Sequence, residues 1–149
     1  QIRSSAASDV YKRQSEKALN AIKNGGFFGQ GIGEGNLKYS VPEAHTDYVL
    51  AIIAEEFGII TIFFIILTLL FIAIRVFSYS QKMSDKFKKT ALIGLISLIL
   101  LQSLINLGVT INLLPTTGMT FPIFSYGGSS LISSLIIYGL ILNLTRKRL

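Results

Sequence analysis

The stretch from Phe57 to Ile74 reads FGIITIFFIILTLLFIAI and contains no charged residue. At about 1.5 Å per residue, a helix over this stretch is roughly 27 Å long, close to the thickness of a bilayer's hydrocarbon core. Its apolar residues run continuously, whereas a strand of a membrane β-barrel alternates apolar with polar residues. The stretch therefore predicts a membrane-spanning helix.

The whole chain has the composition of a membrane protein. Of its 149 residues, 50% are hydrophobic and 15% are charged, whereas soluble domains carry about 25% charge. The apolar excess excludes a disordered chain, and the absence of cysteine excludes a disulfide framework and thiolate metal sites. The net charge is +6, but no basic patch is interleaved with aromatic residues, so we expect no nucleic-acid partner.

A second uncharged run, from Thr90 to Thr145, is too long for one crossing. Two prolines and a glycine between Leu114 and Pro122 should end a helix there, because proline lacks a backbone donor and glycine favours turns. We therefore expect an all-α, polytopic bundle of membrane helices. The expected elements are an external loop over 15–46, spans over 47–74, 91–113 and 124–144, a cytoplasmic loop over 75–90, an external loop over 114–123 and a cytoplasmic tail over 145–149.

Basic residues indicate the orientation. They cluster between the first two expected spans and in the C-terminal tail, and such clusters are retained on the cytoplasmic side. The residues concerned are Arg75, Lys82, Lys86, Lys88, Lys89, Arg146, Lys147 and Arg148. Residues 1–14 differ in composition from the rest of the chain and lack the apolar core of a signal peptide, so we expect an unrelated or artefactual segment there.

Glycines recur on the external side, in the stretch GGFFGQGIGEG from Gly25 to Gly35. A dinucleotide site would require these glycines between a strand and a helix, and no such unit surrounds them. A loop that needs positive φ or a close backbone approach is the simpler interpretation. Because glycine exposes backbone donors, Gly29, Gly31 and Gly33 are also candidates for binding an extended ligand.

An acidic segment, PEAHTD, leads directly into the first expected span. Ser40 and Glu43 fit a capping box, which would explain part of it as a helix start. It would not explain why Glu43, His45, Thr46 and Asp47 lie within five positions of one another. A partly desolvated carboxylate at a membrane interface has a raised pKa, which suits a general base. The residues alone leave both interpretations open.

Two further segments carry polar groups. Glu55 and Glu56 lie about two turns into the same expected helix, where Glu55 could share a cavity with Asp47, whereas Glu56 could simply lie at the wet interface. The stretch SYGGSS from Ser125 to Ser130 lacks the spacing of a hydrolase nucleophile and favours close helix packing. Asn106 and Asn112 are expected to form hydrogen bonds between helices.

Taken together, these segments resemble the SEDS family of membrane glycosyltransferases, which includes FtsW, RodA and SpoVE. The matching motifs are Gly26-x-x-Gly29-x-Gly31-x-Gly33, Pro42-Glu43-Ala44-His45-Thr46-Asp47-Tyr48, Glu55-Glu56-x-Gly58, Asn106, Leu114-Pro115-Thr116-Thr117-Gly118-Met119-Thr120-x-Pro122 and Ser125-Tyr126-Gly127-Gly128-Ser129-Ser130. Ala44 and Thr116-Thr117 are similar to the division-type members, FtsW, more than to the elongation-type RodA.

The resemblance implies a ten-helix enzyme of which this chain is the last three helices and the preceding external loop. It implies polymerisation of lipid II into glycan strands for septal wall synthesis, with Asp47 as the essential acid and Glu43 as the acid beside it. On this basis His45, Thr46, Gly29, Gly31, Gly33, Glu55, Ser125, Gly127 and Gly128 are candidate substrate-binding residues. Because the upstream helices would complete the cavity, we expect the isolated chain to be inactive.

The resemblance also implies partners and a location. These are lipid II, the growing undecaprenyl-linked glycan, membrane lipid, a class B penicillin-binding protein (FtsI-like) and other divisome proteins at the septum of the bacterial cytoplasmic (inner) membrane. The active face would be external and the C-terminus cytoplasmic. A divalent cation, Mg²⁺ or Mn²⁺, could stabilise the leaving pyrophosphate, with no organic cofactor. The alternatives are an elongation-type polymerase, a lipid II flippase and a non-enzymatic divisome scaffold.

Overall fold

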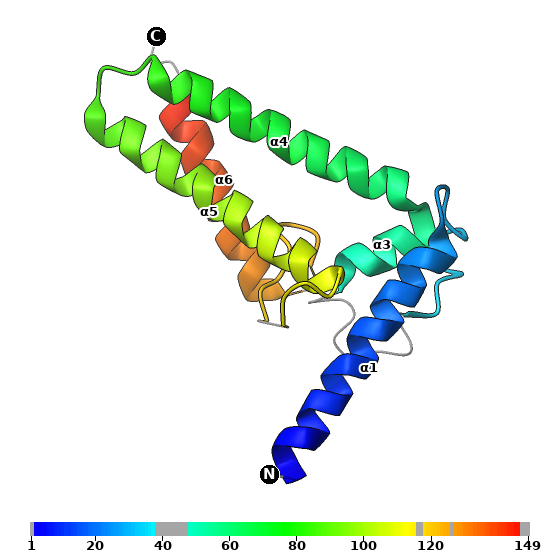
Figure 1. The fold of residues 1–149 in the computed structure, drawn as a ribbon. Coiled ribbons are helices and arrows are strands. Elements are labelled where there is room, and N and C mark those ends of the chain that lie inside the picture. The colour runs from blue at the N-terminus through cyan, green and yellow to red at the C-terminus, as the bar shows by residue number, and fades with distance from the viewer. Residues whose placement is uncertain (1, 38–47, 116–117, 126, 147–149) are drawn as a thin grey trace.

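A computed structural model describes residues 2–37, 48–115, 118–125 and 127–146, with side chains from residue 13 onward. In these ranges the chain forms helices and no strands: α1 (Ile2–Gly25), α3 (Val49–Phe57), α4 (Ile59–Gln81), α5 (Lys86–Thr110) and α6 (Gly128–Thr145). Figure 1 shows α4 and α5 running antiparallel, with α6 beside them toward the α4–α5 connection. Helices α1 and α3 pack against each other near the opposite end of α4.

Three of these helices, α4, α5 and α6, are long and apolar enough to cross a membrane. This finding confirms the expected all-α membrane class and the number of expected spans. Many apolar side chains of α4 are exposed, among them Phe63, Phe64 and Phe71. The expected membrane helices therefore present wide apolar faces to lipid or to other helices.

The first expected span differs from the prediction because it is two helices. Helix α3 ends at Phe57 and α4 begins at Ile59, and Gly58 between them has φ 85° and ψ 168°. This conformation is essentially restricted to glycine, so one residue turns the chain sharply between the helices (Figure 1). As a consequence, Glu55 and Glu56 belong to the short helix α3 and not to the spanning helix α4.

The connection between α4 and α5 is shorter than the loop expected over 75–90. Helix α4 continues to Gln81, and α5 begins at Lys86 with Asp85 as its N-cap. The Asp85 carboxylate accepts hydrogen bonds from the backbone N–H groups of Phe87 and Lys88, at 3.0 and 3.3 Å. Helix α4 extends past the apolar stretch because no proline or glycine before Lys82 interrupts its backbone. Helix α5 begins at Lys86 because the Asp85 carboxylate satisfies N–H groups of its first turn.

Helix α1 continues without a break across residue 14 and through residues expected to be an external loop. Ala18 and Ala21 on α1 are buried together with Leu37, with Tyr48 and Ala51 at the start of α3, and with Val109 near the end of α5. The small alanine side chains allow α1 to approach α3 closely. A second core, which includes Ala73, Leu92 and Ile141, joins α4, α5 and α6.

Candidate functional site

The glycine-rich loop after α1 packs backbone to backbone against the junction of α3 and α4. The Gln30 and Gly31 N–H groups donate to the carbonyl oxygens of Glu55 and Glu56, at 2.9 and 3.1 Å. On the far side of the junction, the Ile59 N–H donates to the Gly26 carbonyl oxygen at 3.0 Å. The loop therefore satisfies backbone groups that the end of one helix and the start of the next would leave unpaired.

Close approach explains one glycine on each side of this contact, Gly29 in the loop and Gly58 at the junction. A Cβ atom on Gly29, which has φ 81°, would overlap the Glu56 carbonyl oxygen, and a Cβ on Gly58 would overlap the Phe27 carbonyl oxygen. Side chains at either position would separate the loop from the helices. The interpretation of this segment as a close backbone approach with positive φ is confirmed.

The role of Gly29, Gly31 and Gly33 in binding a ligand stays a prediction, although two of their backbone N–H groups have partners within the protein. The Gly29 N–H donates to the Gly25 carbonyl oxygen at 2.7 Å, and the Gly31 N–H is used by Glu56. Gly33 also takes part in an interaction, so its backbone is not a free site either. Three apolar side chains of this loop are also exposed. Phe27, Phe28 and Ile32 are 71%, 86% and 80% exposed. The sequence analysis considered only the glycines of this segment and did not identify these side chains.

Glu55 points from α3 into this loop and is almost completely buried, with 2% of its surface exposed. Its two carboxylate oxygens accept hydrogen bonds from the backbone N–H groups of Asn36 and Leu37, both at 3.0 Å. Gly35 makes room for this arrangement, because a Cβ there would lie 2.9 Å from Glu55 Oε2. The expected cavity shared by Glu55 and Asp47 stays a prediction, since Asp47 lies outside the described residues.

Four of the candidate residues, Glu43, His45, Thr46 and Asp47, fall in the range 38–47, outside the described residues. The two residues that flank this range are described. Leu37 precedes it and Tyr48 follows it, and the two belong to one buried cluster. The two residues that flank the acidic segment therefore lie in the same core, which also includes Ala51 of α3.

The connection between α5 and α6 meets α3 from another side. Phe121 is buried in a cluster with Val49 and Leu50, in the first turn of α3. Its backbone N–H donates to Ser125 Oγ at 2.7 Å, and Ser125 is itself buried. Ser125 thus stabilises a turn in this connection, a role that the expectation of substrate binding did not include.

Two amides on α5 hold the same connection. Gln102 Nε2 donates to the Thr120 carbonyl oxygen and Asn106 Nδ2 donates to the Met119 carbonyl oxygen, both at 2.8 Å. One partner of Asn106 is thus a carbonyl oxygen of the connection between α5 and α6, whereas the expected partner was another helix. Gln102 was missed in the sequence, although two amides four residues apart on an apolar helix are a detectable signal.

Asn112 also differs from its prediction. It follows Ile111, the C-cap of α5, and has φ 59°, in the left-handed region. The Asn112 N–H donates to the Val109 carbonyl oxygen and the Leu113 N–H to the Gly108 carbonyl oxygen, at 3.0 and 2.8 Å. This pair of bonds is a Schellman motif, so Asn112 ends the helix and does not join two helices.

The two other candidate glycines lie at the start of α6. Gly127 is the N-cap, with extended backbone, and a Cβ there would lie 2.8 Å from Ser130 Oγ. Gly128 is the first residue of the helix, and a Cβ there would meet nothing within 4 Å. Contact with Ser130 therefore disfavours a side chain at position 127, whereas there is open space for a side chain at position 128.

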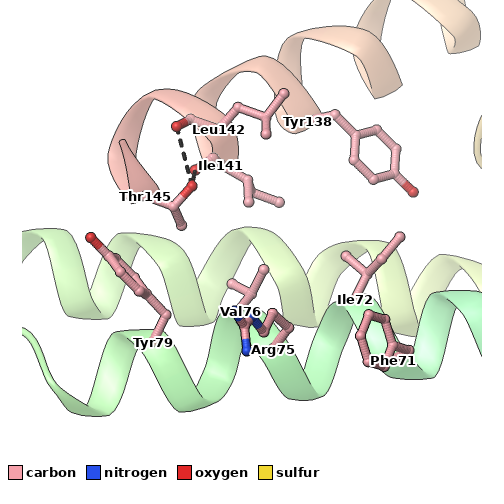
Figure 2. A pocket seen from close by; sticks show the side chains of 9 residues that line it. All are labelled: Phe71, Ile72, Arg75, Val76, Tyr79, Tyr138, Ile141, Leu142 and Thr145. Carbon is pink, nitrogen blue, oxygen red and sulfur yellow. Dashed lines mark hydrogen bonds between the residues drawn. The ribbon is translucent and has the colours of Figure 1, made fainter. Parts of the chain in front are cut away.

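The described residues also line apolar cavities along α4. One, of about 410 Å³, lies between α4 and α6 and includes Arg75, Tyr79 and Tyr138 (Figure 2). A second, of about 300 Å³, lies between α4, α6 and the residues Pro122, Ile123 and Phe124. The first lies toward the C-terminal end of α4, roughly 20 Å along the helix from Gly58, so it is remote from the glycine loop.

Comparison with known proteins decides the family. A model of the FtsW/RodA/SpoVE family, described as cell cycle protein, matches residues 6–149. The chain belongs to this family. The match begins at residue 6 and so includes most of the segment 1–14 that we expected to be unrelated.

Named relatives agree with the family assignment. The chain is 42% identical over 135 residues to a protein of Caulobacter vibrioides, and 46% identical over 126 residues to one of Bacillus subtilis. Both are named "probable peptidoglycan glycosyltransferase FtsW". These matches cover 91% and 84% of this chain but 35% and 31% of the relatives, so the chain spans about a third of their length.

A solved structure has the same fold. It is described as "Structural coordination of polymerization and crosslinking by a peptidoglycan synthase complex", and the TM-score is 0.69 at 29% sequence identity. The likeness covers 89% of this chain and 37% of that chain. The described helices of this chain are thus similar in arrangement to part of a longer chain.

Proposed function

We propose that this chain forms three membrane helices and the preceding outer loop of a longer glycosyltransferase that polymerises lipid II. The observation that carries the proposal is family membership together with relatives named peptidoglycan glycosyltransferase. The acidic segment with Glu43 and Asp47 adds chemical support, because glycosyl transfer needs a base for the acceptor hydroxyl.

In the proposed reaction, Asp47 takes the proton of the acceptor sugar hydroxyl. The hydroxyl oxygen then forms a bond to the anomeric carbon of the lipid-linked donor, with inversion. The bond between this carbon and the pyrophosphate oxygen breaks, and its electron pair leaves with the lipid pyrophosphate. Glu43 is the second acid of the segment, and we propose that His45 and Thr46 bind substrate beside it.

A divalent cation, Mg²⁺ or Mn²⁺, would supply charge stabilisation for the departing pyrophosphate. Among the side chains that the structure describes, no three His, Cys, Asp or Glu residues lie together as a metal site. Loss of polymerisation on chelation, restored by added Mg²⁺ or Mn²⁺, would support a cation requirement.

The proposed orientation places the glycine loop and the acidic segment outside and the α4–α5 connection in the cytoplasm. The lysines of this connection and of the start of α5 support it, because such residues are retained inside. On the outer half of α4, the 300 Å³ cavity beside Pro122 and Phe124 is apolar and offers space for part of a prenyl chain.

The proposed setting is the division septum of the bacterial cytoplasmic membrane. A class B penicillin-binding protein would supply transpeptidation, with other divisome proteins present. The similar solved structure supports a partnership of this kind, since it is described as a complex that coordinates polymerization and crosslinking. Relatives named FtsW favour the division role over an elongation role.

The experiment uses the full-length polymerase that contains this chain, purified with its penicillin-binding protein, whose transpeptidase site is blocked. Labelled lipid II is supplied, and glycan length is measured on gels. Polymeric glycan is the expected product. Transport of lipid II across vesicles without polymer would indicate a flippase, and neither activity would indicate a scaffold.

A further inference from the structure

The apolar cavity of about 410 Å³ between α4 and α6 has one charged side chain, Arg75, among the described residues that line it (Figure 2). We propose that this cavity binds an anionic phospholipid from the leaflet on the side of the α4–α5 connection. Arg75 would bind the lipid phosphate, and an acyl chain would occupy the cavity. The inference goes beyond the proposed reaction, because it uses none of the residues assigned to that reaction.

The first observation is the depth of Arg75 in the membrane. Arg75 lies about 24 Å along α4 from Ile59, the first residue of the helix. With Ile59 at one edge of a hydrocarbon core about 30 Å thick, Arg75 lies just inside the opposite edge. An unpaired charge in hydrocarbon is unfavourable, so a guanidinium at this depth extends toward the phosphates of the nearer leaflet.

The second observation is that the described residues supply no carboxylate for Arg75, whose side chain forms no ion pair with any of them. After Glu56 the sequence contains one acidic residue, Asp85. Its carboxylate lies 3.5 Å from Lys88 Nζ and accepts two backbone N–H groups at the start of α5. The charge of Arg75 therefore calls for an anion from outside the described part of the chain.

Other basic residues lie at the same end of the helices. Lys82 is the C-cap of α4, Lys86 is the first residue of α5 and Arg146 is the C-cap of α6. Basic residues beside a membrane surface attract anionic lipids more than zwitterionic ones. The charge around the cavity is therefore complementary to an anionic headgroup.

The third observation is the polarity of the cavity along its length. Figure 2 shows Tyr79 and Thr145 at one end and Phe71 and Tyr138 at the other. The end with Tyr79 is nearer the end of α4 and so nearer the headgroups, whereas the other end points toward the bilayer centre. Apolar side chains lie between the two ends, namely Ile72, Val76, Ile141 and Leu142.

Arg75 and Tyr79 form the polar end together. They are four residues apart on α4, so they lie on the same side of the helix. Among the described residues the Tyr79 hydroxyl has no hydrogen-bond partner, so it can donate to a phosphate oxygen beside the guanidinium. A guanidinium binds phosphate through two parallel hydrogen bonds, which a zwitterionic headgroup with its own ammonium group satisfies less well.

The test uses the full-length protein that contains this chain, in phosphatidylcholine nanodiscs with a trace of photoreactive lipid. The lipid is phosphatidylglycerol with a diazirine on one acyl chain, or phosphatidylcholine with the same chain. After illumination, labelled residues are located by mass spectrometry. Phosphatidylglycerol should label residues 71–79 and 138–145 at least about fivefold more than phosphatidylcholine does, because only its net negative charge complements Arg75.

Variants of Arg75 test the headgroup contact. Arg75→Gln should lower labelling by phosphatidylglycerol about tenfold, because charge-assisted hydrogen bonds are lost. Lys86→Gln is the matched control, since it removes the same charge at the same end of the helices but does not line the cavity. Its labelling should stay unchanged. Arg75→Lys should give an intermediate loss, because lysine keeps the charge without the planar fork.

A variant of Leu142 tests the acyl-chain contact. Leu142 is exposed and lines the cavity, so the larger side chain in Leu142→Trp would fill part of the space without disturbing a buried core. Labelling should fall about threefold or more, because the chain loses volume to occupy. Leu140→Trp is the control, since Leu140 is also exposed on α6 but does not line this cavity.

Equal labelling by the two lipids would overturn the proposal. So would equal labelling of the wild type and Arg75→Gln at equal unfolding midpoints. Absence of label from both segments would also overturn it and show that another helix of the longer protein covers the cavity. If Arg75→Gln does not fold, unchanged labelling in both Arg75→Lys and Leu142→Trp would contradict the site.

Discussion

The backbone N–H of Ile59 donates to the carbonyl oxygen of Gly26 at 3.0 Å, although the two residues belong to different elements. This hydrogen bond fixes the start of a membrane-spanning helix on a loop far back in the sequence. This bond and the bonds from Gln30 and Gly31 hold the backbone on both sides of Gly58, so α3 and α4 meet there at a fixed corner. The corner lets α3 lie against α1 while α4 crosses the membrane.

Gly58→Ala should destabilise this corner. The residue has φ 85° and ψ 168°, a conformation that costs a side chain about 1–3 kcal/mol, and its Cβ would also overlap Phe27. The measurement is the unfolding midpoint of the protein in detergent micelles. Gly94→Ala is the matched control, because a Cβ at that helical glycine meets nothing within 4 Å. An unchanged midpoint in Gly58→Ala would contradict the account of the corner.

Asn112→Ala should lower the free energy of unfolding by about 1 kcal/mol, because alanine tolerates the left-handed region less well than asparagine. Asn112→Gly should leave the free energy unchanged or raise it, because glycine enters this region without strain. Equal loss in both variants would show that the Asn112 side chain has another role. The two variants are compared in the same unfolding assay.

Asn106→Ala should lower the free energy of unfolding by about 1–3 kcal/mol, the typical result of leaving a buried hydrogen-bond partner unsatisfied. Asn106 is fully buried, and its amide donates to the Met119 carbonyl oxygen. Amide exchange in residues 118–125 should rise at the same time. Asn143→Ala on the exposed side of α6 is the control and should change neither quantity.

The start of α5 should depend on pH through Asp85. The hydrogen bond from the Lys88 N–H, with a further one from Phe87, lowers the pKa of the Asp85 carboxyl from its usual 3.8. A lowered folded-state pKa means that the ionised group stabilises the helix start fully above pH 3.8, and that this contribution is lost as pH falls through the folded-state pKa.

Amide exchange at Phe87 and Lys88, corrected for its intrinsic pH dependence, measures this effect. Protection should decrease at the acid end of the range in the wild type. Asp85→Asn keeps a good N-cap without a titrating group, so its protection should not respond to pH in this window. A pH response that persists in Asp85→Asn would assign the effect to another group.

Much of the architecture could be predicted from the sequence, because long uncharged runs and proline-rich interruptions are local signals. Three spans were expected, and three helices are long and apolar enough to cross a membrane. The break at Gly58 was missed, since a single glycine in an apolar run looks like a tolerated helix residue. Its effect comes from a loop distant in sequence, which supplies the partner for Ile59.

The sequence was enough to identify residues of the candidate site, but it did not predict which residues they contact. The glycines from Gly25 to Gly35 stood out, but their partners on α3 depend on tertiary packing. Glu55 was identified as unusual because an acid within an expected membrane helix should face a protein interior or a water-filled cavity, and the structure supplies backbone donors from Asn36 and Leu37. The acidic segment itself lies outside the described residues, so its roles stay predictions.

The most direct test of the central claim compares wild type with Asp47→Asn in the full-length polymerase, purified with its blocked penicillin-binding protein. Turnover of labelled lipid II into glycan is measured on samples with equal unfolding midpoints. The account predicts polymeric glycan from the wild type and none from Asp47→Asn, because the variant lacks the base for the acceptor hydroxyl. Equal glycan from both proteins would contradict it and remove Asp47 from the chemistry.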